Sequence, residues 1–277
     1  MDRHRARAVL AELADSAWIA AHLQDASLRL VELDVSSTAY ESGHIPGAVF
    51  WNAYSDLRDP DYIPIGTAQL EGLLSRSGIT PQDTLVFYGY GAALGFWLMQ
   101  AHGHRDVRML AGSRERWAQD GGRWSTEVPS PAPSAYPLAR ASAEMLASRA
   151  DVEAALSDPG VVLLDVRSEL EFSGERFWPS GAPEDVGRAG HVPGAVSVPI
   201  NLLLDDDGAP RDAEELRRVL QAAGVAPAQA VISYCTIGNR ASQAAFALRY
   251  LLDYPDVRVY YPSWVEWGKA DGTPVER

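Results

Sequence analysis

Short apolar runs alternate with amphipathic segments along the chain. The runs are nearly continuous in Val, Leu and Ile, a pattern typical of strands that are covered on both faces. Segments between them, such as 213–223 and 241–252, carry apolar residues at helical spacing. The strands expected from this pattern are 29–35, 48–51, 85–88, 107–110, 161–166, 195–199, 230–234 and 257–261. Strand–helix alternation of this kind predicts an α/β fold with mostly parallel sheets flanked by helices.

The pattern occurs twice. A Gly-His-Ile-Pro-Gly-Ala-Val segment at 43–49 returns as Gly-His-Val-Pro-Gly-Ala-Val at 190–196. Likewise, Gly-Ile-Thr-Pro at 78–81 returns as Gly-Val-Ala-Pro at 224–227. Because these matches keep their order along the chain, we interpret the two halves as copies of one architecture.

A proline-rich stretch at 128–137 lies between the copies and has the composition of a stiff connector without a core face. The full length of 277 residues suits two domains better than one. We therefore predict an N-terminal domain at 1–128, a linker at 129–141 and a C-terminal domain at 142–277.

Composition narrows the classes of function. The formal net charge of −13 opposes phosphate backbones, so we expect no nucleic-acid partner. No apolar run is long enough to span a membrane, and we expect no membrane association. The single cysteine, Cys235, excludes an intramolecular disulfide framework and a cysteine-rich zinc site. The charged start of the chain lacks the pattern of a secretion signal, which predicts a reducing, cytoplasmic setting.

Candidate chemistry is concentrated where the expected strand at 230–234 ends. Cys235 follows this strand, and Arg240 precedes a helical segment after four intervening residues. Ligands of open α/β folds bind at the carboxyl ends of strands. A tight loop at a helix start directs backbone N–H groups and partial positive charge at the sulfur, which favours the thiolate. The loop residues expected to surround the sulfur are Thr236, Ile237, Gly238, Asn239 and Arg240.

A lone cysteine is more often a small buried hydrophobe, and this alternative competes with a reactive role. The internal repeat discriminates between them. Cys235 corresponds to Gly89 in the first copy, whose loop has neither a cysteine nor an arginine. A cysteine needed only for packing gives no reason to lose the arginine as well. We therefore predict one active copy, the second, and one structural copy.

The repeated Gly-His-x-Pro-Gly segments and the cysteine loop resemble those of the rhodanese family, specifically tandem-domain thiosulfate or 3-mercaptopyruvate sulfurtransferases. The resemblance covers about residues 27 to 267. It implies two rhodanese-like domains, of which the second is catalytic. It also implies that Cys235 takes a sulfane sulfur from a donor as a persulfide and passes it to cyanide, a thiol or another acceptor. No metal and no organic cofactor belong to that cycle.

The loop between Cys235 and Arg240 is shorter by one residue than that of related phosphatases and arsenate reductases, so sulfur chemistry is favoured over phosphate chemistry. Sulfite is a stable leaving group, so we expect no catalytic histidine. Cys-x-Ile-Gly-x-Arg loops resemble those of tandem relatives called thiosulfate sulfurtransferases, which selects thiosulfate as the donor. Transfer from 3-mercaptopyruvate remains an alternative, as does a sulfur relay that delivers the persulfide to a partner protein.

Two arginines are candidate clamps for an anionic donor, Arg240 in the loop and Arg188 just before the second Gly-His segment. Some thiosulfate-using members carry a further arginine shortly after the motif matched here by 165–168. Glu171 holds that position in this chain, a departure that puts the contact in doubt. Asp165 is expected to support the site by orienting backbone N–H groups or an arginine, with a purely structural ion pair as its alternative. Trp264 could wall the pocket, with core packing as its alternative.

Overall fold

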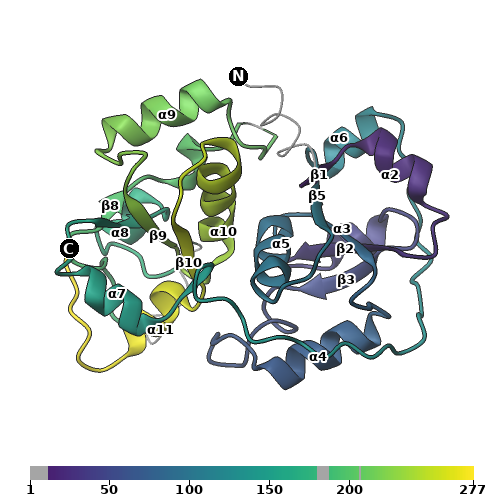
Figure 1. Cartoon of the computed structure of the whole chain (residues 1–277), viewed down its shortest axis with the longest axis horizontal. Helices are drawn as coiled ribbons and strands as arrows, with labels where there is room; N and C mark the ends of the chain where they lie inside the picture. Colours follow the sequence, from purple (N-terminus) through teal and green to yellow (C-terminus); the bar gives the residue numbers. More distant parts are fainter. Residues whose placement is uncertain (1–11, 180–186, 206) are drawn as a thin grey trace. The chain divides into compact units, whose positions relative to one another are not determined.

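The structure is a computed structural model that describes residues 12–179, 187–205 and 207–277. The chain forms two compact units, and the second begins at Ser142. Each unit contains a five-stranded parallel sheet flanked by helices (Figure 1). This confirms the α/β class and the doubled architecture expected from the sequence.

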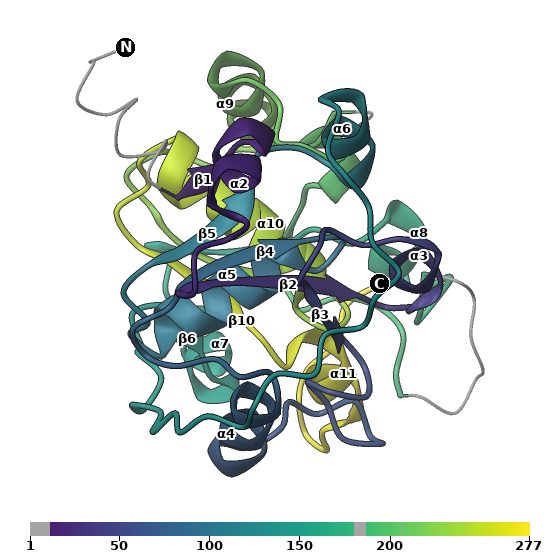
Figure 2. The ribbon, with the colours of Figure 1, turned by 90° about the vertical axis from the view of Figure 1, so that its right-hand side faces the viewer.

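In the first unit the strand order is β1-β5-β4-β2-β3, which Figure 2 shows with the strands side by side. The last three of these strands pair in parallel, with Leu30 beside Val86 and Leu33 beside Trp51. The elements of this unit are β1 (Leu13–Ala14), α2 (Ser16–His22), β2 (Leu28–Asp34), α3 (Thr38–Ser42), β3 (Val49–Asn52), α4 (Thr67–Arg76), β4 (Thr84–Tyr88), α5 (Ala92–Ala101), β5 (Val107–Leu110) and α6 (Arg114–Gln119).

The second unit has the equivalent order, β6-β10-β9-β7-β8, so that β9 lies in the middle of its sheet. Both neighbours of β9 run parallel to it. The elements are β6 (Leu146–Ala147), α7 (Arg149–Ala155), β7 (Val161–Asp165), α8 (Glu169–Phe172), β8 (Val196–Ser197), the 3-10 helix η2 (Ile200–Leu202), α9 (Ala213–Ala222), β9 (Ala230–Tyr234), α10 (Asn239–Phe246), the π-helical turn η3 (Ala247–Leu251), β10 (Val257–Tyr260) and α11 (Ser263–Lys269).

The expected strands are present, with bounds that shift by one or two residues in most cases. The largest change is the segment expected at 195–199, which contains only the two-residue strand β8 and then meets Pro199. Proline lacks the N–H that a sheet requires, so the strand cannot continue through position 199. The edge strands β1 and β6 were not expected, because two residues are too few to show a hydrophobic period.

Each Gly-His-x-Pro-Gly turn is tied to the central strand of its own sheet by a buried tyrosine. Tyr88 ends β4, and its hydroxyl accepts the N–H of Ile45 at 3.1 Å. Tyr234 ends β9, and its hydroxyl accepts the N–H of Val192, also at 3.1 Å. The two contacts occupy matching positions of the repeat, so the sequence motif is a structural fastening in both units.

The histidines of these turns also bond to backbone. The His44 ring lies within hydrogen-bond distance of the carbonyl oxygens of Tyr40 and Glu127. His191 Nδ1 lies 2.8 Å from the carbonyl oxygen of Phe172 and stacks on that ring. Both histidines are buried and hold their turns, so the two copies share this structural role.

The proline-rich segment packs on the first unit instead of running free. The Ser134 N–H donates to the Ser75 carbonyl at 3.1 Å, and the Leu138 N–H donates to Glu71 Oε1 at 2.8 Å. Tyr136 is buried, and its hydroxyl bonds to the ring of His104. The expectation of a segment without a core face was wrong, because its aromatic residue supplies such a contact.

Within the described residues, no helix combines the length and apolar character that crossing a membrane requires. The start of the chain, on which the expectation about a secretion signal depends, falls in residues 1–11. These residues lie outside the part of the chain that the structure describes.

Candidate active site

The cysteine lies at the carboxyl end of the middle strand of the second sheet. Every residue of β9 after Ala230 is buried, since neighbouring strands pair on both sides and helices cover both faces. Cys235 follows directly and is 1% exposed. Helix α10 begins four residues later, at Asn239, and Arg240 lies in its first turn. The strand-to-helix loop expected from the sequence is therefore present where ligands bind in such folds.

The sulfur faces a backbone donor of its own loop. The N–H of Gly238 points at Cys235 Sγ, with an N···S distance of 3.1 Å. Gly238 has φ +84°, and a Cβ there would lie 2.7 Å from the carbonyl oxygen of Tyr261. Only glycine fits, because this conformation and this space both exclude a side chain. The first turn of α10 follows, and the N-terminal end of the helix dipole adds partial positive charge.

Helix α11 fastens the outer side of the loop. The N–H groups of Trp264 and Val265 donate to the carbonyl oxygens of Cys235 and Thr236, at 3.0 and 3.1 Å. The N–H of Cys235 donates to Ser263 Oγ at 3.2 Å. The amide of the cysteine itself is therefore engaged away from the sulfur. The backbone donor that faces the sulfur is the N–H of Gly238, three residues further along the loop.

Ser263 was not identified from the sequence. Its backbone has φ +58°, which is strained for a residue with a Cβ, and its side chain is fully buried. Its hydroxyl accepts from Cys235 and donates to the Tyr260 carbonyl at 2.7 Å. A serine in a Ser-Trp segment gives no local signal of either feature, because both depend on how β10 turns into α11.

Substitutions at Ser263 separate these two features. Ser263→Ala leaves the buried N–H of Cys235 unpaired and keeps the strain, so we expect a loss of about 2 kcal/mol in unfolding free energy. Ser263→Gly also loses the hydroxyl but relieves the strain, and should be more stable than the alanine variant by about 1 kcal/mol. Urea denaturation of the two variants measures the difference. A glycine variant that is no more stable than the alanine variant would contradict the strained conformation.

Arg240 is held by a carboxylate. Its Nη1 and Nη2 donate to the two oxygens of Glu171, both at 2.8 Å. The Thr236 hydroxyl donates to Glu171 Oε1 at 2.7 Å and accepts from Arg240 at the same distance. Glu171 is fully buried and also closes a capping box with Ser168 at the start of α8. The position read as a departure from the family pattern is thus the counter-ion of the loop arginine.

The arrangement keeps Glu171 ionised. Burial by itself would raise the pKa of the carboxyl, but hydrogen bonds from Arg240 and Thr236 and the charge of Arg240 outweigh it and lower the pKa to about 2. The pair is therefore a full ion pair at any pH at which the protein works. Its two charges cancel beside the cysteine.

This ion pair makes part of the stability dependent on pH. The folded-state pKa of Glu171 lies below its ordinary value of 4.5, so the unfolded chain binds the proton first as the pH falls. A contribution of about 3 kcal/mol should be complete above pH 4.5 and disappear towards pH 2. In urea denaturation, the stability gap between wild type and Glu171→Gln should narrow over that window. A gap that stays constant from pH 5 to pH 2.5 would rule out the lowered pKa.

A second buried ion pair supports the end of β7. Arg167 donates through Nε and Nη2 to the carboxylate of Asp165, with the shortest contact at 2.6 Å, and to the Gly190 carbonyl at 2.7 Å. Its guanidinium stacks on Trp264, 4.5 Å from the ring centroid. Asp165 therefore orients an arginine, one of the two roles expected of it. Trp264 is fully buried, which agrees with core packing, one of the two alternatives expected for it.

Arg188 is used elsewhere in the fold. Its guanidinium donates to the carbonyl oxygens of Trp267, Gly268, Ala270 and Thr273, around the end of α11. These acceptors fix the arginine as a C-terminal cap of that helix. The expectation of a second clamp facing the cysteine was wrong, because proximity to the Gly-His segment in sequence does not determine where a long side chain points.

The equivalent loop of the first unit packs against strand β2 and bonds to it. The N–H of Gly91 donates to the Leu33 carbonyl at 2.8 Å, and that of Tyr90 donates to Asp34 Oδ2 at 3.2 Å. A Cβ at Gly91 would lie 1.9 Å from a Leu33 methyl carbon, so this loop rests directly on β2. These two amides are engaged within the protein, so neither is available to an added atom.

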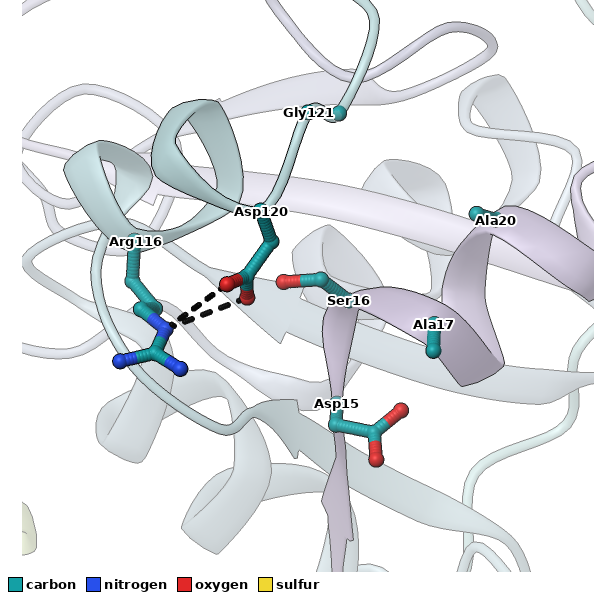
Figure 3. A pocket seen from close by; sticks show the side chains of 8 residues that line it. Asp15, Ser16, Ala17, Ala20, Arg116, Asp120 and Gly121 are labelled. Atoms are coloured by element: carbon teal, nitrogen blue, oxygen red, sulfur yellow. Dashed lines mark hydrogen bonds and ion pairs between the residues drawn. The ribbon is translucent and has the colours of Figure 1, made fainter.

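The first unit does have an open hollow of about 440 Å³ between α2 and α6. In Figure 3 the Asp120 carboxylate points towards Ser16 and forms an ion pair with Arg116. Small side chains of α2 line the rest. Asp120 pairs with Arg116, Asp15 accepts the N–H of Trp18, and no thiol is among the residues that line the hollow. The chemistry and this hollow therefore belong to different units.

The chain is similar to known proteins over nearly its whole length. A family model described as "Rhodanese-like domain" matches twice, at residues 15–120 and 148–270. A "Sulfur carrier protein TtuD" of Thermus thermophilus is 36% identical over 276 residues, covering 96% of each chain. A "Putative thiosulfate sulfurtransferase" of Haloferax volcanii is 38% identical over 275 residues, again covering 96% of each chain.

Solved structures give the same picture of the fold. An anaerobic ergothioneine biosynthesis enzyme of Chlorobium limicola, bound to trimethyl histidine, has a TM-score of 0.84 and 26% identity, covering 96% of this chain and 70% of its own. The wild-type structure of EanB has a TM-score of 0.87 and 25% identity, covering 100% and 70%. Both contain more chain than the part matched here.

Proposed function

Because the chain belongs to the rhodanese-like domain family, we propose that it is a sulfurtransferase that takes the sulfane sulfur of thiosulfate as a persulfide on Cys235. The observation that carries this proposal is the N–H of Gly238 directed at Cys235 Sγ from a loop that opens a helix. Curated relatives of full matching length are named for sulfur transfer or sulfur carriage, which supports the same class of reaction.

The reaction proceeds as two displacements at sulfur. The Cys235 thiolate attacks the outer sulfur of thiosulfate, the sulfur–sulfur bond breaks, and its electron pair leaves on sulfite. The persulfide anion extends one atom beyond the cysteine, where N–H groups from the residues between Thr236 and Arg240 surround it. Cyanide or a thiolate then attacks the outer sulfur, and the Cys235 thiolate is regenerated. Neither step needs a proton donor, a metal or an organic cofactor.

We propose that only the second unit carries sulfur. The matching loop of the first unit has Gly89 in place of the cysteine, and its amides bond to Leu33 and Asp34. Within the second unit, Asp165 and Arg167 act as support below the loop, and Arg240 acts through its contacts with Glu171 and Thr236. The first unit would then contribute stability or a partner surface.

A donor panel on the purified protein tests the proposed reaction. With cyanide as acceptor, kcat/KM is measured for thiosulfate and for 3-mercaptopyruvate. Thiosulfate as the better donor supports the proposal, and 3-mercaptopyruvate as the better donor replaces it. Slow turnover with either, together with rapid transfer from a preformed Cys235 persulfide to a carrier protein, would favour the relay role suggested by the likeness to the sulfur carrier of Thermus thermophilus.

A further inference from the structure

The positive charge that the cysteine loop presents to an incoming donor is smaller than its sequence suggests, because Arg240 is paired with Glu171. Arg240 is the cation within the Cys235–Arg240 loop, and Glu171 binds it through both carboxylate oxygens. The Glu171 side chain is fully buried, whereas that of Arg240 is 12% exposed. Solvent therefore screens the pair poorly, and the negative charge stays beside the cation permanently.

Cancelled charge has different consequences for different donors. Thiosulfate is a dianion and loses strong hydration when it enters a buried site, so its binding depends on a compensating cation. A persulfide on a small uncharged alkyl group has no such requirement. Its affinity depends on apolar contacts, and Ile237, two residues after Cys235, adds a buried apolar side chain to the loop.

We infer that Glu171 is a specificity-determining residue, which cancels Arg240 and so keeps the affinity for dianionic donors low while favouring sulfane sulfur on uncharged alkyl carriers. This inference rests on the proposed sulfur transfer through Cys235. Thiosulfate is then a donor of weak affinity, and small alkyl persulfides compete with it at low concentration.

The alternative step has the same balance of atoms and electrons. The Cys235 thiolate attacks the outer sulfur of a protonated alkyl persulfide, and the sulfur–sulfur bond of that donor breaks. Its electron pair leaves on the alkyl thiolate, and the proton remains on the transferred sulfur. Cys235 thus gains one sulfur atom and becomes a persulfide. No oxidant, reductant or additional cofactor takes part.

Glu171→Gln tests the inference with little change in shape. Glutamine can also close the capping box with Ser168 when its amide oxygen takes the place of Oε2, where it still accepts from Arg240 Nη1. With the negative charge removed, we expect the KM for thiosulfate and the inhibition constant of sulfate, a non-reacting dianion, to fall about tenfold. The kcat/KM for the persulfide of N-acetylcysteine methyl ester should change less than about twofold.

Glu171→Asp serves as the matched control, because it shortens the side chain but keeps the charge. A purely structural role predicts that both variants lower activity with both donors and leave the sulfate constant unchanged, a result that would overturn the inference. A tenfold gain for the dianions with Gln and none with Asp supports it. Unfolding curves of each variant confirm that folded protein is compared.

A double variant keeps the question answerable if Glu171→Gln alone does not fold. In Glu171→Gln with Arg240→Gln, no unpaired charge is buried and the net charge of the pair is again zero. The rates with both donors fall together, and their ratio should stay within about twofold of wild type. A selective loss of thiosulfate activity beyond about tenfold would show that Arg240 binds the dianion despite Glu171, which contradicts the inference. Failure of all donors with wild-type protein would instead refute the proposed function.

Discussion

A Cys235→Ser variant is expected to lose at least about a thousandfold in kcat/KM for thiosulfate with cyanide as acceptor. A serine hydroxyl remains protonated at neutral pH and is a poor nucleophile towards sulfur. The group that the structure places against Sγ is the N–H of Gly238, a donor that stabilises an anion but cannot remove a proton. The loss therefore falls on the chemical step, and it is measured by steady-state kinetics.

The control for this variant is its stability. Serine is nearly the size of cysteine, and Trp264 and Val265 bond to the backbone of the loop, not to the sulfur. The unfolding midpoint should therefore stay within a few degrees of wild type. A folded Cys235→Ser variant with more than a tenth of wild-type activity would exclude the cysteine as the sulfur carrier.

The second large effect is expected at Gly238. Gly238→Ala places a Cβ 2.7 Å from both the carbonyl oxygen and a ring carbon of Tyr261, at a φ of +84° that alanine adopts only with strain. The loop must shift, which moves the N–H away from the sulfur. We expect a loss of about 2 kcal/mol in unfolding free energy and at least a hundredfold in kcat/KM.

Gly224 offers a matched control for backbone strain. It has φ +81°, close to that of Gly238, but a Cβ there meets nothing within 4 Å. Gly224→Ala should therefore cost about 1 kcal/mol and leave kcat/KM unchanged. If the two alanine variants lost activity equally, the loss would come from general destabilisation and not from the cradle at Cys235.

The position of the cysteine was predictable because it depends on local sequence and on a repeat. Cys235 follows an apolar run and precedes a glycine and a helical segment. This local pattern predicts a strand end and a tight loop without knowledge of the tertiary contacts. The first copy then showed which residues the architecture itself needs. The turn histidines His44 and His191 belong to this set, since both copies contain them and both are buried.

What could not be predicted depends on contacts between distant segments. Glu171 and Arg240 are 69 residues apart, and neither carries a local sign of the other. Arg188 lies beside a family motif, yet its long side chain reaches the end of α11, 85 residues further on at Thr273. The strain at Ser263 likewise depends on how β10 joins α11. Pairings of this kind follow from the folded sheet and leave no periodic pattern in the chain.

The most direct test of the account is the mass of the protein after exposure to thiosulfate. Reduced protein is treated with thiosulfate, freed of excess donor, and measured intact and as peptides. The account predicts a gain of about 32 Da, one sulfur atom, on the peptide that contains Cys235, and its removal by cyanide. An unchanged mass under conditions in which the folded protein turns over thiosulfate would contradict the persulfide at Cys235.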